Sequence, residues 1–307
     1  MKKAILLTVC VLTLILLAAC GASQPSAPPE APDPAVSVPN FTAGTLPRLD
    51  GSTATIPLSE GIVKSLLGYD AAQAQAFVHH NTTHNAYVNL IDGRCDLIFV
   101  TPPSEEEYAL MEEAGGGFAV EPVVKDAFVF LVNRNNPVDD IALSDLQKIY
   151  RGEITNWKEL GGSDAPILPF QRPDNSGSQT LMYKLLVLKA EIMDAPTELR
   201  PSGMDDLVDA VSDYDEGLNS IGYSVFYYAS GMYTDPDSKL ISVDGVLPTA
   251  ETIADGTYPL TDGYYAVYRA ENDGDTPVGR LLSWLRSDAG QRTAAAEGYV
   301  PLSPLQP

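Results

Sequence analysis

Short apolar runs alternate with longer segments of helical spacing in the first part of the chain that follows residue 40. Pro57 near the start of one such segment and Gly68 at its end are typical helix start and stop signals. Strands that alternate with helices in this way predict a parallel, doubly wound sheet. The predicted elements are a strand that ends at Asp50, a helix over 57–67, a strand over 77–80, a helix that follows 81–83 and ends near Ile91, and a strand over 96–100.

Two long β-rich runs organise the rest of the chain. The first begins at Glu121 and has no turn residue until Asn133, and the second covers 258–270. The other predicted elements are a helix capped by Ser144, a strand over 165–173, a helix that begins just after Ser176, an acid-rich helix over 204–214, a strand over 220–229, and a helix pair over 278–302.

This order of elements predicts an α/β fold of two lobes, each a doubly wound, mostly parallel sheet flanked by helices. The chain would cross between the lobes twice, near 122–132 and 258–268. Lobe I would then comprise 41–125 plus 258–307, and lobe II would comprise 126–257. A body of roughly 265 residues is large for one core and suits two domains. Ligands of such sheets bind at the carboxyl ends of strands, where helix N-termini point.

The N-terminus has the pattern of a secretion signal. Lys2 and Lys3 precede an uncharged apolar run over 4–19, which is too short to span a bilayer comfortably. The run ends in Leu-Ala-Ala-Cys, which resembles the lipobox of bacterial lipoproteins. We therefore predict a lipoprotein signal peptide over 1–19 and lipidation of Cys20.

A tether is predicted over 20–40, because Pro, Ala and Ser dominate there without apolar periodicity. No later stretch has about 18 consecutive apolar residues. A lipid followed by a tether and a globular body predicts a protein anchored at the extracellular face of the cytoplasmic membrane. Gly21 and the long tether favour a Gram-positive-type cell surface.

The charge narrows the possible partners. A formal net charge of −22 argues against nucleic acid and against anionic lipid, but a small anion responds to local donors rather than to net charge. Cys95 is the only cysteine of the body, so we expect a buried structural thiol and no intrachain disulfide.

Three loops that precede predicted helices share one chemistry. Residues 51–55, 82–84 and 176–178 are rich in hydroxyls, and Arg172 lies four residues before the third loop. A helix N-terminus exposes unpaired N–H groups and receives anions, and a guanidinium can donate two parallel hydrogen bonds to an oxyanion. Serine and threonine also cap helices routinely, which is the alternative reading of each single loop.

The stretch "IYRGEITNWKELGGSDAPILPFQRPDNSGSQT" resembles the phosphate-binding proteins of ABC transporters, and "DGSTATIPL" is similar to their first ligand loop. The resemblance extends at lower specificity over most of 44–303. It implies a two-lobed, type II periplasmic-binding-protein-like fold, phosphate as ligand, an ABC permease as partner, a monomer, and neither cofactor nor metal. The implied anion-binding residues are Ser52, Thr53, Thr55 and Thr83 from lobe I, and Arg172, Ser176, Gly177 and Ser178 from lobe II.

One position departs from the family pattern. The family places a buried aspartate after the strand that corresponds to 96–100, where it accepts the proton of hydrogen phosphate. Thr101 stands at that place here. A carboxylate separates protonated phosphate from sulfate, whereas a hydroxyl can donate or accept, so sulfate, molybdate, tungstate or a small organic anion remain alternatives. A surface receptor or scaffold that lacks transport is the alternative from another class.

No catalytic or metal-binding role is predicted. His79, His80 and His84 lie close together, but the first two would face opposite sides of a strand. Ser176 lacks a base in its own lobe, and no G-x-S-x-G motif occurs. Asp174 is expected to orient Arg172 instead.

Overall fold

The computed structural model describes residues 37–213 and 217–305. These described residues all belong to one compact unit. The predicted signal peptide, Cys20 and most of the predicted tether lie outside the described residues. In the described part, each helix is too short or too polar to cross a bilayer.

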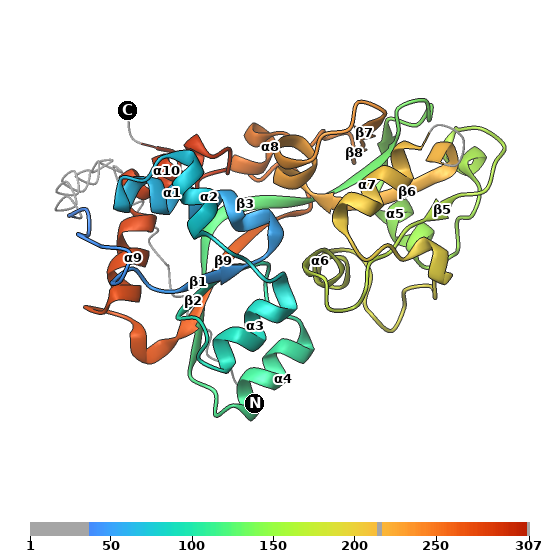
Figure 1. The fold of residues 1–307 in the computed structure, drawn as a ribbon. Helices are drawn as coiled ribbons and strands as arrows, with labels where there is room; N and C mark the ends of the chain where they lie inside the picture. Colours follow the sequence, from blue (N-terminus) through green and yellow to red (C-terminus); the bar gives the residue numbers. More distant parts are fainter. Residues whose placement is uncertain (1–36, 214–216, 306–307) are drawn as a thin grey trace, which may run out of the picture. The chain divides into compact units, whose positions relative to one another are not determined.

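A seven-stranded sheet runs through the described residues, with two long strands at its centre (Figure 1). The strand order is β1-β2-β9-β3-β6-β5, and β7 also pairs with β3, while β4 and β8 form a separate two-stranded sheet. The strands are β1 Leu49–Gly51, β2 Leu97–Val100, β3 Phe118–Asn133, β4 Asp140–Ile141, β5 Leu168–Pro169, β6 Ser220–Val225, β7 Ser238–Leu240, β8 Ser242–Val243 and β9 Thr261–Arg269.

Strand β3 changes its partner halfway along its length. Residues from Phe118 to Ala127 pair with β9, whereas residues from Phe128 onward pair with β6. We call β1, β2 and β9 the β1 side of the sheet, and β5, β6 and β7 the β6 side. The two long strands predicted from the sequence are confirmed, and β3 connects the two sides.

The sheet is mixed, so the prediction of mostly parallel sheets is wrong. Strand β3 is antiparallel to β9, β6 and β7, and β9 is antiparallel to β2. Parallel pairing joins β1 to β2, β5 to β6, and β4 to β8. The two long strands, β3 and β9, run in opposite directions, and each is antiparallel to every strand with which it pairs.

Helices flank both the β1 side and the β6 side of the sheet (Figure 1). As predicted, α6 begins directly after Ser176, and α1 has Pro57 in its first turn and ends at Gly68, whose φ is 68°. The helices are α1 Ile56–Leu67, α2 Ala71–Phe77, α3 Thr83–Ile91, α4 Glu105–Glu113, α5 Leu143–Tyr150, α6 Gly177–Leu185, α7 Met204–Ser212, α8 Ala250–Ala254, α9 Pro277–Arg286 and α10 Asp288–Ala296.

The strand predicted over 77–80 is wrong, because helix α2, which starts with a capping box, extends to Phe77 and residues 78–80 pair with no strand. The Asp70 carboxylate accepts from the Gln73 amide at 2.8 Å, and the Gln73 side chain accepts from the Asp70 amide at 3.0 Å. The helix continues to Phe77, and no strand pairing follows it before α3.

Two further boundaries differ from the sequence prediction. Helix α5 begins at Leu143 behind Ala142, so Ser144 lies inside its first turn and is not its cap. Strand β6 ends at Val225, and a π-helical turn over Tyr228–Met232 replaces the rest of the strand predicted over 220–229.

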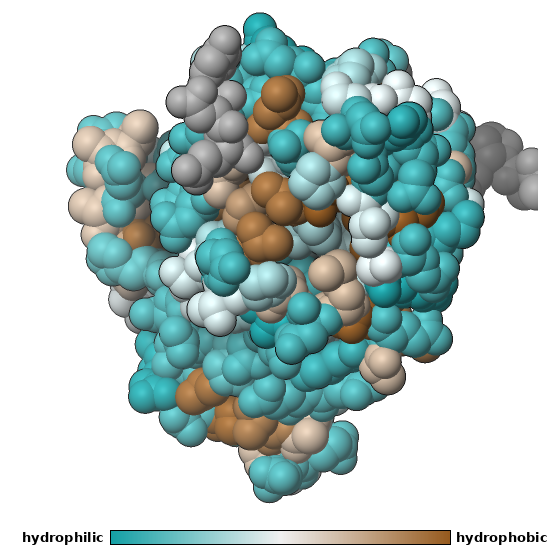
Figure 2. Space-filling model, turned by 90° about the vertical axis from the view of Figure 1, so that its right-hand side faces the viewer, coloured by the Kyte–Doolittle hydropathy of each residue, from teal (hydrophilic) through white to brown (hydrophobic). Residues whose placement is uncertain are grey.

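Buried aromatic side chains fill the region around β3. The Phe128 and Phe130 rings meet edge to face with centroids 5.2 Å apart, and the Trp157 Nε1 donates to the Asn219 carbonyl at 2.8 Å. These contacts confirm Trp157 as a structural residue. Hydrophilic residues predominate on the face shown in Figure 2, where apolar residues form small, separate groups.

Candidate functional site

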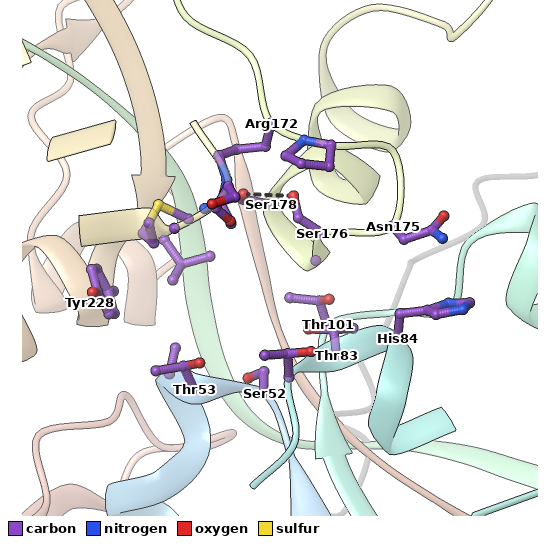
Figure 3. A pocket seen from close by; sticks show the side chains of 18 of the residues that line it. Ser52, Thr53, Thr83, His84, Thr101, Arg172, Asn175, Ser176, Ser178 and Tyr228 are labelled. Atoms are coloured by element: carbon purple, nitrogen blue, oxygen red, sulfur yellow. Dashed lines mark hydrogen bonds between the residues drawn. The ribbon is translucent and has the colours of Figure 1, made fainter. Parts of the chain in front are cut away.

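A cavity of about 530 Å³ lies between the N-terminal turns that lead into α1 and α3 on the β1 side and those of α6 and α7 on the β6 side (Figure 3). Val225, Tyr228 and Tyr264 also line it, and we call these three residues the floor of the cavity. The sequence-predicted ligand residues that border the cavity are Ser52, Thr53, Thr83, Thr101, Arg172, Ser176, Gly177 and Ser178.

Backbone groups make this cavity electropositive in spite of the acidic composition. Each helix N-terminus leaves N–H groups unpaired and carries a partial positive charge, which favours negative charge nearby. Arg172 is the only lysine or arginine in the described lining of the cavity. Four helix ends and one guanidinium therefore favour an anion at this place, although the net charge of the chain is −22.

The first loop is held in place by His80. The Ser52 carbonyl lies 2.9 Å from His80 Nδ1, and the Ser59 Oγ lies 3.0 Å from Nε2. A carbonyl can only accept, so Nδ1 carries the proton and Nε2 accepts from the serine hydroxyl. Burial lowers the pKa of His80, which keeps the ring neutral at pH 7 and makes it a structural link between the loop and α1.

Thr55 is the predicted ligand residue that does not border the cavity. Its side chain is fully buried, and its Oγ1 donates to the Phe99 carbonyl at 2.7 Å. Its amide donates to the Ser52 carbonyl at 3.1 Å. Thr55 therefore stabilises the first loop from behind instead of facing the cavity.

The second loop contains a strained residue at the cavity wall. Thr82, the residue before α3, has φ 70° and ψ 164°, a backbone region that is essentially restricted to glycine. Such strain costs about 1–3 kcal/mol and clusters at functional sites. Thr83 follows as the first residue of α3 and borders the cavity as predicted.

Thr101 presents an unpaired hydroxyl to the cavity. It directly follows β2, it is 3% exposed, and its Oγ1 has no hydrogen-bond partner among the described residues. Its carbonyl accepts from the Tyr87 hydroxyl at 3.1 Å, which fixes the backbone at this point. A buried polar group without a partner is costly, so this hydroxyl is suited to a bound ligand.

Arg172 is a buried cation whose guanidinium has one described hydrogen-bond acceptor, a backbone carbonyl. Its Nη2 donates to the Ser202 carbonyl at 2.6 Å, while its Nε has no partner among the described residues. Its amide donates to the Gln179 Oε1 at 2.9 Å and to the Tyr223 hydroxyl oxygen at 2.8 Å. Burial lowers the pKa of Arg172, although a guanidinium stays charged in proteins.

The expectation that Asp174 orients Arg172 is wrong. The Asp174 carboxylate accepts from the Tyr183 hydroxyl at 2.6 Å and pairs with the Lys189 Nζ at 2.9 Å. Ser202, which precedes α7, supplies the orienting acceptor in its place.

The N-terminus of α6 contacts the β1 side of the cavity. A Cβ atom on Gly177 would collide with the Thr101 Oγ1 and lie 2.8 Å from the Thr83 Oγ1, so only glycine fits there. Figure 3 shows Ser176 and Ser178 next to each other on this helix end, with their hydroxyl oxygens 3.5 Å apart. The predicted residues of the two sides thus meet in one place.

Sequence reasoning missed the fourth helix end and the floor of the cavity. Ser202 and Gly203 precede α7 as Ser176 and Gly177 begin α6, so the same local signal was present. Tyr264 and Tyr228 carry no such signal, because only the crossing of strands places them at the cavity.

His84 borders the cavity but does not point toward its centre. Its Nδ1 lies 3.2 Å from the Oε1 of the buried Glu107, and Figure 3 shows the ring directed away from Thr83 and Thr101. Across residues 37–213 and 217–305, no three or more His, Cys, Asp or Glu side chains gather in an arrangement that could hold a metal ion.

A family model described as PBP superfamily domain matches residues 45–289. The chain is 32% identical over 176 residues to the phosphate-binding protein PstS of Bacillus subtilis (strain 168), which covers 57% of this chain and 55% of that relative. It is 27% identical over 178 residues to the phosphate-binding protein PstS of Borreliella burgdorferi, which covers 57% of this chain and 63% of that relative. The matches thus span less than two thirds of both curated relatives.

The chain is also similar to solved structures. The chain is 26% identical, with a TM-score of 0.65, to a Clostridium perfringens structure described as a phosphate ABC transporter substrate-binding protein with bound phosphate, over 82% of this chain and 98% of that chain. An ABC-type phosphate transport receptor from Vibrio cholerae, 23% identical with a TM-score of 0.60 over 82% and 98% of the two chains, supports the α/β fold alone. The names of these relatives describe binding proteins, which is the class of protein that the sequence predicts.

Proposed function

The chain belongs to the PBP superfamily, and on that premise we propose that it captures an oxyanion outside the cell, with inorganic phosphate favoured, and delivers it to an ABC permease. It performs no chemical step and needs no cofactor. The phosphate-binding relatives support the choice of ligand, and the geometry of the cavity supports the class of ligand.

One observation carries the proposal. Two deeply buried polar atoms that lack partners among the described residues, Thr101 Oγ1 and Arg172 Nε, border a cavity surrounded by helix N-termini. A tetrahedral oxyanion offers acceptors in several directions, so it can satisfy the guanidinium, the hydroxyls and the backbone N–H groups together. A neutral ligand would leave the charge of Arg172 without compensation.

Closure of the two lobes is the proposed mechanism. We assign lobe I to 41–125 plus 258–307 and lobe II to 126–257, with β3 and β9 as the connections. At roughly 30 Å³ per water, a cavity of about 530 Å³ has room for more than a dozen waters, far more than one small anion requires. Closure would expel this water and strengthen each hydrogen bond to the anion. The permease would then recognise the closed form.

A thermal-shift titration of residues 36–307 tests the ligand directly, because these residues form one compact unit. Phosphate at 100 times its Kd adds about 2.7 kcal/mol to the stability of the folded state. A shift with phosphate and none with a neutral sugar is the expected result. The absence of a shift with phosphate, sulfate and molybdate alike would contradict oxyanion binding.

The second candidate ligand is a fully ionised oxyanion such as sulfate. The observation in its favour is Thr101, a hydroxyl at the position where the family pattern has an acceptor carboxylate. A larger thermal shift with sulfate or molybdate than with phosphate would keep the transport role and change the cargo.

We also propose that the protein is a monomer, anchored through a lipid on Cys20 at a Gram-positive-type cell surface. The proposal rests on the Leu-Ala-Ala-Cys sequence and on the tether that follows it. Cys20→Ser should move the protein from the membrane fraction to the medium. Retention in the membrane fraction would contradict the anchor.

A further inference from the structure

Tyr264 brings a third unpaired polar atom to the cavity. It lies on β9, it is 1% exposed, and it borders the cavity beside Val225 and Tyr228. Its hydroxyl is buried and has no hydrogen-bond partner among the described residues. A tyrosine hydroxyl that is buried normally finds a partner, so this one is available to a ligand.

Asp126 lies behind Tyr264, at the point where β3 changes its partner. Its side chain is buried, and its Oδ1 accepts from the Ala127 amide at 2.7 Å and from the Tyr227 amide at 3.1 Å. These two bonds connect β3 to the segment that follows β6. The second oxygen, Oδ2, has no partner among the described residues.

The two groups influence each other although no full hydrogen bond joins them in this structure. Burial raises the pKa of Asp126 to about 7, and the amides of Ala127 and Tyr227 and the hydroxyl of Tyr264 oppose that shift. Burial raises the pKa of Tyr227 and of Tyr299, and the charge of Asp126 adds to both shifts. Their hydroxyls donate to the carbonyls of Glu297 and Ala54, so neither supplies a hydrogen bond to Asp126. A movement of the Tyr264 hydroxyl toward Oδ2 would pair two buried atoms at once.

We propose that Tyr264 is a specificity-determining ligand contact, which donates its proton to Asp126 and accepts a hydrogen bond from the P–OH group of a protonated phosphate. The inference rests on the proposed function. Asp126 touches no ligand and acts as a positioning residue for the hydroxyl.

The direction of the hydrogen bonds gives the selectivity. A tyrosine hydroxyl has one donor hydrogen, so a hydroxyl that donates to Asp126 offers only lone pairs to the cavity. Lone pairs welcome a protonated oxygen and repel an anion that carries no proton, such as sulfate. Tyr264 and Asp126 together therefore supply the hydrogen-bond acceptor for the P–OH group that a carboxylate at position 101 would supply.

A rival acceptor is Asp205, the only carboxylate in the described lining of the cavity. Asp205 is exposed and lies in the first turn of α7, where helix N–H groups and water compete for its oxygens. The Tyr264 hydroxyl is buried in the floor and meets no such competition. Asp205→Asn separates the two possibilities.

The test is isothermal calorimetry of the whole chain with phosphate and with sulfate at one fixed, mildly alkaline pH. Tyr264→Phe leaves the P–OH group unpaired, so phosphate affinity should fall roughly 5- to 100-fold while sulfate affinity does not fall. Asp126→Asn should reverse the preference, because its amide donates to the Tyr264 oxygen and turns the phenolic hydrogen toward the cavity. Sulfate affinity should then rise as phosphate affinity falls.

Tyr150→Phe is the matched control. It removes another buried hydroxyl that lacks a partner among the described residues, but it lies away from the cavity. It should leave the affinities for both anions unchanged. Thermal unfolding of each variant identifies any that does not fold, and Tyr264→Phe keeps the test valid if Asp126→Asn fails to fold.

The ratio of the two affinities distinguishes the possible outcomes. An unchanged ratio in Tyr264→Phe, or a shift in the ratio that appears in Asp205→Asn alone, would overturn this inference and leave the proposed function intact. An equal loss of affinity for phosphate and for sulfate would give Tyr264 a structural role only and would also overturn this inference. A wild-type chain that binds neither anion would overturn the proposed function itself.

Discussion

Replacement of Arg172 by methionine should lower ligand affinity strongly and leave the stability of the ligand-free protein nearly unchanged or higher. Methionine keeps an unbranched apolar stem and removes the guanidinium, so the buried space stays largely filled. The amide bonds from Arg172 to Gln179 and Tyr223 involve only the backbone and remain. The substitution therefore isolates the charge.

The loss of affinity follows from the donors that the guanidinium offers. One charge-assisted hydrogen bond contributes about 1.5–3 kcal/mol, and 1.4 kcal/mol corresponds to a factor of ten. Arg172→Met should weaken phosphate binding by roughly 10- to 150-fold if a single bond is lost. A larger loss is expected if the fork binds two oxygens or if closure depends on it.

The ligand-free protein should lose little stability or gain some. Arg172 is 9% exposed, its guanidinium donates to the Ser202 carbonyl, and it forms no ion pair with a described carboxylate. Removal of this donor costs about 1–3 kcal/mol if the carbonyl becomes unpaired, but removal of a poorly compensated buried charge offsets that cost. We expect a net change within about 1 kcal/mol, or a gain.

Calorimetry with phosphate and urea unfolding of the ligand-free protein measure the two effects separately. Arg151→Met serves as the control, because Arg151 pairs with Glu191 at 2.6 Å on the surface and does not border the cavity. The control should bind phosphate normally and lose at most about 1 kcal/mol. Unchanged affinity in Arg172→Met, or a parallel loss of affinity and of several kcal/mol of stability, would refute the reasoning.

Three further predictions use the same assays. Thr101→Asp should raise phosphate affinity relative to sulfate and improve phosphate binding at lower pH, and a pH-independent ratio in calorimetry would contradict this role of position 101. Thr82→Gly should relieve backbone strain and add about 1–3 kcal/mol, with a melting temperature higher by roughly 2–4 °C per kcal/mol, whereas a lower melting temperature would argue against strain. Burial raises the pKa of Asp126 from 3.8 to about 7, so its contribution to stability is complete below about pH 4 and is lost as the pH rises through 7. Urea unfolding of wild type relative to Asp126→Asn should follow that decline, and parallel pH profiles would contradict it.

Much of the cavity could be predicted from the sequence, because its signals are local. A helix that begins after Ser176-Gly177-Ser178 exposes its N–H groups whatever surrounds it, and Thr83 at the start of α3 follows the same rule. The sequence predicts the two long strands for a similar reason, since β-branched and aromatic residues are concentrated in β3 and β9.

The sequence predictions that differ from the structure fail because hydrogen bonds to other partners decide where a side chain or a segment lies. Thr55 faces inward because the Phe99 carbonyl, 44 residues away, accepts its hydroxyl proton. Asp174 turns toward Tyr183 and Lys189, although Arg172 is closer in sequence. The strand predicted over 77–80 fails because α2 extends to Phe77 and the residues after it bond to the first loop, with the His80 ring at the Ser52 carbonyl and the Asn81 amide at the Asp50 carboxylate.

The directions of the strands were the least accessible property, and they matter most for the floor of the cavity. Only antiparallel pairing of β3 with β9 brings Asp126 opposite Asp262 and Val124 opposite Tyr264, which places Asp126 and Tyr264 on neighbouring positions. Strand β3 leaves β9 for β6 between Ala127 and Phe128, one residue after Asp126. The Tyr227 amide that binds Asp126 follows β6, whereas Tyr264 belongs to β9. The rotation of the β6 side against the β1 side that the proposed closure requires would therefore act on the residues around Asp126, next to Tyr264 in the cavity wall.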